Sequence, residues 1–147
     1  MSRTISFRGL INDGGIDTIP LQTNNGLTGY QITKFEIMDN LPGQQDVNHI
    51  IQIFKTEQAT ASATVDFSDN RLLGAAMERE SVGAEDMAVS KSVIFDSEKF
   101  NQDIYITHVE TTSNKSANYY IELKQMKLDL SEQSVATLKN IRNTGSQ

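Results

Sequence analysis

The sequence predicts one all-β domain, an antiparallel β-sandwich that is jelly-roll-like over residues 1–130, followed by a short helix or tail over residues 131–147. Apolar and polar side chains alternate along several short stretches, which is the period of half-buried strands. Turn signals recur about every eight to twelve residues, as in sandwiches and barrels. No rhythm of alternating strands and helices appears, so a parallel sheet is not expected. A chain of 147 residues suits one domain.

The clearest strands are predicted at residues 4–8, 103–109 and 119–123, the last within a strand over 119–128. In the first of them, Ile5 and Phe7 lie on one side, with polar residues on the other. Further strands are expected at 16–23, 30–38, 50–55 and 60–67. Pro20 places the stretch at 16–23 at a sheet edge or a bulge, because proline has no backbone N–H to donate to a neighbouring strand.

Two of these strands change parity partway along, which predicts a β-bulge in each. The first bulge is expected near Thr33 and Lys34, and the second near Lys124 and Gln125. From the strand faces we expect eight buried residues, namely Phe7, Ile32, Phe54, Phe67, Ile104, Ile106, Ile121 and Leu123.

Three segments have less regular patterns. Residues 71–80 are compatible with a short helix or a buried strand, and Gly74 weakens the helix. Residues 81–91 are expected to form a polar surface loop. Residues 131–142 place Val135, Leu138 and Ile141 at three-residue spacing, which predicts an amphipathic helix that needs a surface to lie on.

Composition excludes several functions. The net charge is -6 and the 13 basic residues are scattered, so we expect no direct nucleic-acid binding. The absence of cysteine removes disulfides and thiol chemistry and favours folding in a reducing cytoplasm. The first ten residues have no apolar core like that of a signal peptide, so we expect a soluble product of the cytoplasm that does not enter a membrane.

The only histidines are His49 and His108. His108 and Glu110 would share one face of a strand, where they could act as a general base and its orienting carboxylate. The interpretation that we favour is a polar cross-strand pair near a strand end, and His49 is expected to cap a loop. No nucleophile motif or glycine-rich phosphate loop occurs. We therefore predict no catalytic residue and no cofactor.

Four carboxylates, those of Asp66, Asp69, Glu78 and Glu80, could approach one another around a hard cation such as calcium. Their spacing matches no calcium loop, so a solvated rim is favoured and no metal is predicted. Residues 114–116 fit a glycosylation acceptor pattern, which we interpret as coincidence. In the pair Tyr119 and Tyr120 one ring must point inward and the other outward. The outward ring could stack on a sugar or a base, or lie in a subunit interface.

The segments IFDSEKFNQDIYIT (94–107) and YYIEL (119–123), with TISFRG near the start and GYQITKFEIM (29–38), resemble small virion structural proteins of tailed phages of marine bacteria. The resemblance implies a particle component, for example a capsid decoration or cement protein that binds the major capsid protein from outside. The core, which is lean for the length of the chain, and the apolar stripe at residues 135, 138 and 141 predict a homo-oligomer. The resemblance suggests a trimer as the first choice. The alternatives are a carbohydrate-binding β-sandwich and, third, a small β-barrel enzyme.

Overall fold

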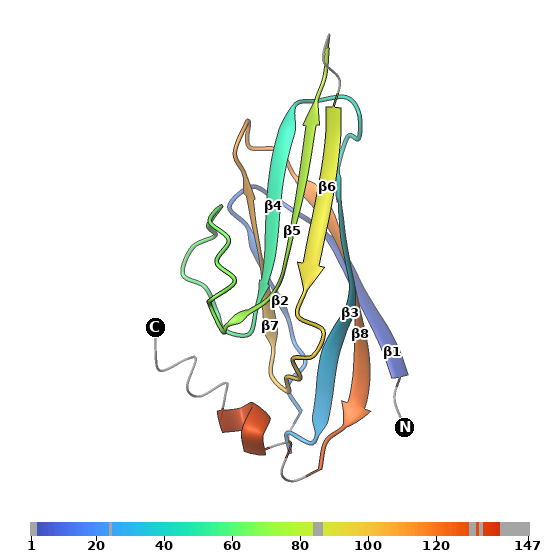
Figure 1. Cartoon of the computed structure of the whole chain (residues 1–147), viewed down its shortest axis with the longest axis vertical. Coiled ribbons are helices and arrows are strands. Elements are labelled where there is room, and N and C mark those ends of the chain that lie inside the picture. The colour runs from blue at the N-terminus through green and yellow to red at the C-terminus, as the bar shows by residue number, and fades with distance from the viewer. Residues whose placement is uncertain (1–2, 24, 84–86, 130–131, 133, 139–147) are drawn as a thin grey trace.

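The computed structural model contains eight β-strands and describes residues 3–23, 25–83, 87–129, 132 and 134–138. The strands are β1 (Arg3–Ile11), β2 (Ile16–Ile19), β3 (Thr28–Asp39), β4 (Val47–Phe54), β5 (Leu72–Ser81), β6 (Met87–Ile94), β7 (Ile104–Glu110) and β8 (Ala117–Lys127). Figure 1 shows an elongated molecule in which the strands run along the longest axis.

The strands form two antiparallel sheets that pack face to face, which confirms the predicted β-sandwich. The smaller sheet has the order β1-β8-β3, and the larger one β2-β7-β4-β5-β6. Strand β1 thus pairs with β8, β2 with β7, and β4 with β5, which is the rolled-up pairing of a jelly roll. The departure is β6, which pairs with β5 in the larger sheet instead of with β3.

The core lies between the sheets, where the inward side chains of both interdigitate. Five of the predicted core residues, Ile32, Ile104, Ile106, Ile121 and Leu123, belong to the buried cluster. Phe7 packs against this cluster while partly exposed, and Phe54 is buried outside it. The prediction for Phe67 is wrong, because this ring is 56% exposed and contacts Phe95 edge-to-face instead of entering the core.

The first predicted bulge is confirmed, since the pairing of β3 with β8 shifts between Ile32 and Lys34. Thr33 is the extra residue, so Ile32 and Phe35 can both point into the core. The second predicted bulge is wrong. Strand β8 pairs with β3 in unbroken register from Leu123 to Lys127, and with β1 up to Gln125. Met126 is simply an apolar residue on the outer side of the strand.

Residues 60–67 do not form the predicted strand and lie in a loop between β4 and β5. The side-chain amide of Gln52, which is buried, donates to the carbonyls of Ser62 and Thr64. The loop therefore covers part of the outer face of the larger sheet. Its alternation matched a strand, but its backbone partner is a side chain and not a neighbouring strand.

The hairpin formed by β5 and β6 resolves one open question and overturns one prediction. Residues 71–80 are a strand, because β5 pairs on both sides and can bury Leu73 and Ala76 between the sheets. The loop predicted at 81–91 is wrong over its second half, where β6 begins at Met87.

After β8 the described part of residues 131–142 is helical, at 132 and 134–138. The predicted apolar stripe does not face the domain: Val135 is 54% and Leu138 58% exposed, whereas Ala136 is buried. Ile141 lies outside the described residues. The helix is held by polar contacts, since Lys99 pairs with Glu132 and the Asn101 amide donates to the Thr137 hydroxyl.

Candidate functional site

The outer face of the β1-β8-β3 sheet is the candidate site. Cross-strand register places Arg8, Tyr120 and Glu36 in one row across the three strands. The next row contains Leu10, Asn118 and Met38. Leu10 is 55% and Met38 57% exposed, although each is large and apolar. This face therefore joins a charged row to an apolar one.

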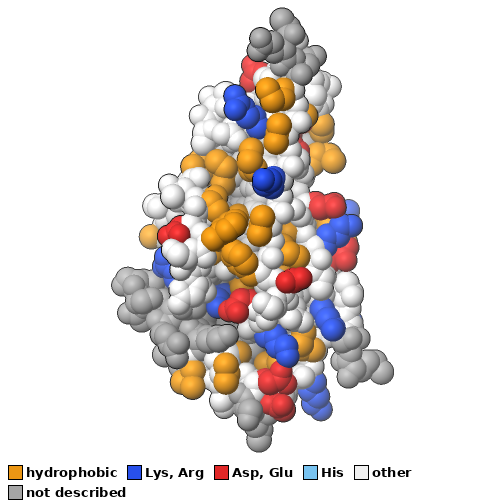
Figure 2. All heavy atoms as spheres, in the orientation of Figure 1, with side chains coloured by type: hydrophobic (Ala, Val, Ile, Leu, Met, Phe, Trp, Pro, Cys, Tyr) orange, Lys and Arg blue, Asp and Glu red, His pale blue; other side chains and the backbone are white. Residues whose placement is uncertain are grey.

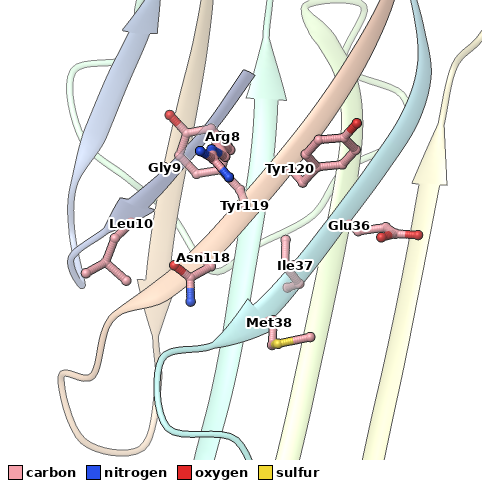
Figure 3. Close-up of a pocket in the computed structure, with 9 residues that line it drawn as sticks. All are labelled: Arg8, Gly9, Leu10, Glu36, Ile37, Met38, Asn118, Tyr119 and Tyr120. Carbon is pink, nitrogen blue, oxygen red and sulfur yellow. The ribbon is translucent and has the colours of Figure 1, made fainter. Parts of the chain in front are cut away.

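These residues line a groove of about 540 Å³, which Figure 3 shows in close-up. Backbone of all three strands forms its floor, with Gly9 and Ile37 among the lining residues. A groove of this volume lies in the range of ligand sites, but such sites are usually deep and enclose most of the ligand. Here the surface is an open sheet face, which suits a flat partner better than a small molecule.

Tyr119 and Tyr120 point to opposite sides of β8, as predicted. The Tyr119 ring is buried and its hydroxyl donates to Asp17 of β2 over 2.9 Å, which links the two sheets. Gly9, opposite Tyr119, is needed there because a Cβ atom would come within 2.9 Å of the Tyr119 hydroxyl oxygen. Burial raises the pKa of Tyr119 well above its usual value of 10.0.

Tyr120 is half-buried on the outer face, where its neighbours fix its position. Its hydroxyl donates to Glu122 over 2.7 Å, and this hydrogen bond raises the pKa of Tyr120. The Lys34 ammonium lies 5.9 Å from the ring centroid, within the range of a cation–π contact. Lys34 also lies 3.7 Å from Glu36. The ring is thus preoriented, with one of its faces turned toward a lysine.

A second polar cluster lies between the sheets and consists of Asp39, His49 and His108. His49 Nε2 is 2.8 Å from Asp39 Oδ1, and His49 Nδ1 is 2.9 Å from His108 Nε2. Neither histidine has any exposed surface, and Asp39 is 1% exposed. These distances fit a hydrogen-bonded chain in which His49 Nε2–H donates to Asp39 and His108 Nε2–H donates to His49 Nδ1.

This cluster overturns the prediction for His49, which does not cap a loop but points into the core from β4. Sequence reasoning missed its partner Asp39, which ends β3 and lies ten residues before His49, on a strand of the other sheet. An Asp–His pair can orient a general base. Because all three side chains are closed to solvent, a substrate would reach them only after the sandwich opened.

Glu110 shares the inward face of β7 with His108, as expected, but its carboxylate is bonded to the backbone and not to His108. Its carboxylate accepts hydrogen bonds from the backbone N–H groups of Asn48, Thr112 and Ser113. Such bonds favour the ionised form and hold the pKa of Glu110 below its usual value, although burial acts in the opposite direction. Glu110 therefore anchors the turn after β7.

Burial of His108 predicts a loss of stability in mild acid. Burial lowers the pKa of His108 below its ordinary value of 6.5. The unfolded chain therefore binds more protons near pH 6 than the folded chain does, so this contribution is present above pH 6.5 and is lost as the pH falls. Each unit of pKa difference corresponds to about 1.4 kcal/mol. Urea unfolding at pH 7.5 and 5.5 should show the loss, and His108→Gln should reduce it.

The raised pKa of Glu78, caused mainly by burial, acts with the opposite sign. Its contribution is present when the carboxyl is protonated and is lost as the pH rises through its folded-state pKa. The comparison between the two proteins therefore carries the test. A change in stability between pH 7.5 and 5.5 that is equally large in the native protein and in His108→Gln would contradict the assignment to His108.

The four carboxylates considered as a calcium site form two separate pairs. Asp66 and Asp69 lie in the loop before β5, bonded to Ser68 and Arg71. Glu78 and Glu80 lie near the other end of β5, where they accept from the backbone N–H groups of Asp39 and Gly43. Leu72 and Glu80 are eight residues apart on β5, which corresponds to roughly 26 Å along the strand, so the two pairs lie near opposite ends of β5. Among the described residues no group of three metal-binding side chains occurs.

Comparison with known proteins adds no identification: no family model and no curated protein matches this chain. Within the described residues, no helix is long and apolar enough to cross a membrane.

Proposed function

We propose that this chain is a non-enzymatic structural component of a phage particle, a decoration or cement protein that docks on the outside of the capsid shell. The observation that carries the proposal is the outer face of the β1-β8-β3 sheet, where Leu10 and Met38 are more than half exposed beside Tyr120. Apolar residues beside a charged row are the composition of a protein interface with a core and a rim.

The resemblance to virion proteins of marine tailed phages supplies the partner, the major capsid protein, and the virion as its location. The trimer also comes from this resemblance and stays a prediction. A rigid sandwich with an open, preoriented face is suited to this role, because a cement protein has to cover a flat surface with little rearrangement.

Binding to phage shells tests the proposal. Met38→Asp places a carboxylate in the apolar row, where it would be buried unpaired in the complex. We expect it to weaken binding of the labelled protein to purified shells about ten- to a hundredfold. Thr4→Asp is the matched control, since Thr4 is an exposed residue of β1 outside the groove. It should bind within about threefold of the native protein, as rim substitutions do.

Equal binding by both variants would remove this face from the proposal. If the native protein did not co-sediment with any shell at protein concentrations up to about 100 µM, the docking role itself would be overturned.

The alternative, a carbohydrate-binding module, is favoured only by Tyr120. Sugar platforms commonly stack on several aromatic rings, whereas Tyr120 is the one outward aromatic among the described residues of this sheet. Glycan binding that was lost in Tyr120→Ala and retained in Met38→Asp would favour the alternative over docking on a shell.

A further inference from the structure

Strand β6 is an edge strand that is exposed on both faces. It pairs with β5 alone among the described strands, and its first six residues are all exposed. Met87 is 53% and Val89 43% exposed. Figure 2, which views the molecule from the side of β4, β5 and β6, shows hydrophobic side chains gathered on the upper part of this face with Lys and Arg between them.

This edge lacks the features by which proteins block edge-to-edge association. Strand β6 has eight residues, no proline and one charged residue, Lys91, and its register with β5 has no bulge. The other edges differ: β2 has four residues, β1 carries Arg3 and Arg8, and β3 contains a bulge. Strand β6 is therefore the edge best prepared to accept another strand.

The register shows which backbone groups face outward from β6. The amide of Phe95 donates to the carbonyl of Leu73, so these two residues form a hydrogen-bonded pair. Along an antiparallel pair of strands, hydrogen-bonded and non-hydrogen-bonded residue pairs alternate. The next pair, Gly74 and Ile94, is therefore not hydrogen-bonded, and the register continues from it to Met87 without a shift. Every second residue of β6 therefore directs its N–H and C=O away from β5, at Ala88, Ser90 and Ser92.

The two faces of β6 follow from its partners in β5, because opposite residues share a face. Ser90 lies opposite Glu78, whose carboxylate reaches Asp39 between the sheets, so Ser90 is on the inner face. Lys91 is consequently on the outer face. The inner face holds Ala88, Ser90 and Ser92, and the outer face holds Met87, Val89, Lys91 and Val93.

We propose that β6 pairs antiparallel with β6 of a second copy of this chain, with Ser90 facing Ser90 across a twofold axis. This register uses the outward backbone groups of Ala88, Ser90 and Ser92, and joins the two larger sheets into one continuous sheet. A register centred between two residues would place opposite faces together and is excluded by the pleat. A register centred on Lys91 would place two lysines directly opposite each other.

In the Ser90-centred register the facing side chains are compatible. On the outer face Met87 lies opposite Val93 of the second copy, and Val89 lies opposite its Lys91, whose aliphatic stem can cover a valine. On the inner face small residues meet: Ala88 faces Ser92. The nearest like charges are the two Lys91 side chains, which are diagonal neighbours roughly 7–8 Å apart. Arg79, which lies opposite Val89 in β5, is two strands or roughly 10 Å from Lys91 of the second copy. Salt screens part of both repulsions.

This contact follows from strand geometry and does not depend on the proposed docking to a shell. A dimer in solution without affinity for any capsid would leave it intact and overturn the docking role alone. The paired segment is short, so the association belongs to the weak, reversible class. The proposed contact gives a dimer, whereas the resemblance predicts a trimer. Sedimentation distinguishes the two assemblies by their mass.

Proline at the twofold axis tests the contact. Ser90→Pro removes a backbone N–H that faces away from β5, so the hairpin of β5 and β6 should keep its fold. In the dimer the same N–H is missing from both copies, so two hydrogen bonds between the copies are lost. We expect sedimentation equilibrium to show a dimer whose dissociation constant rises roughly ten- to a hundredfold in this variant. Ser90→Ala keeps the N–H and is the matched control, with an unchanged dimer.

A pair of charge variants tests the register without touching the backbone. Val89→Lys places a lysine opposite Lys91 of the second copy and should weaken the dimer, whereas Val89→Glu places a carboxylate between Lys91 and Arg79 and should strengthen it. Equal effects of the two variants would contradict the register.

Because the chain has no cysteine, single substitutions give a clean cross-linking test. Ser90→Cys should form a disulfide-linked dimer on oxidation, since paired residues lie about 5.5 Å apart between Cα atoms. Val89→Cys is the matched control, because its counterpart is displaced by two residues and lies beyond roughly 7 Å. A native monomer at all concentrations, or cross-linking through position 89 and not 90, would overturn the proposal.

Discussion

Ile121→Ala is expected to lower the free energy of unfolding by about 2–5 kcal/mol, since the side chain is fully enclosed and a cavity would remain. Ile121 lies at the middle of β8, between Phe7 of β1 and Phe35 of β3. For a domain of this size the loss corresponds to a fall in melting temperature of roughly 5–15 °C. Thermal unfolding followed by circular dichroism measures it.

Leu10→Ala is the control for this variant, because it truncates an aliphatic residue of the same sheet that is 55% exposed. Its effect should stay within about 0.5 kcal/mol. Similar melting temperatures for the two variants would mean that the faces of β8 and β1 are assigned wrongly.

His49→Ala should have an effect of similar size for a different reason. The change leaves Asp39 and His108 buried without their partner, and each buried hydrogen-bonding group left unsatisfied costs about 1–3 kcal/mol, or more if it is charged. Asn48→Ala, on the same strand, removes only a side-chain bond to Thr111 at the surface and should cost about 1 kcal/mol or less. Equal urea midpoints would show that the cluster contributes little to stability.

Much of the fold follows from local patterns in the sequence. Ile104 and Ile106 alternate with polar residues because one side of β7 faces the core, and the parity change at Thr33 marks a real bulge. The same pattern failed at Phe67, because alternation states which side a residue would face, and not whether a neighbouring strand exists. Strand β6 was missed because small residues and Lys91 dilute an alternation of Met87, Val89 and Val93.

The candidate site was only partly predictable. That one ring of Tyr119 and Tyr120 points outward follows from the pleat alone. Leu10 and Met38 were a signal in the sequence that was not used, since each places an apolar side chain on the polar side of its strand. The cluster of Asp39, His49 and His108 could not be predicted, because it joins three strands whose pairing is decided by the whole topology.

Electron microscopy of purified virions that carry a labelled copy of this protein tests the particle role most directly. We predict label on the outside of the head, in regular positions, that is retained on washing and lost when the copy carries Met38→Asp. Virions that contain the labelled protein only at the tail, or do not contain it at all although it is expressed, would contradict the proposed role as a capsid decoration protein.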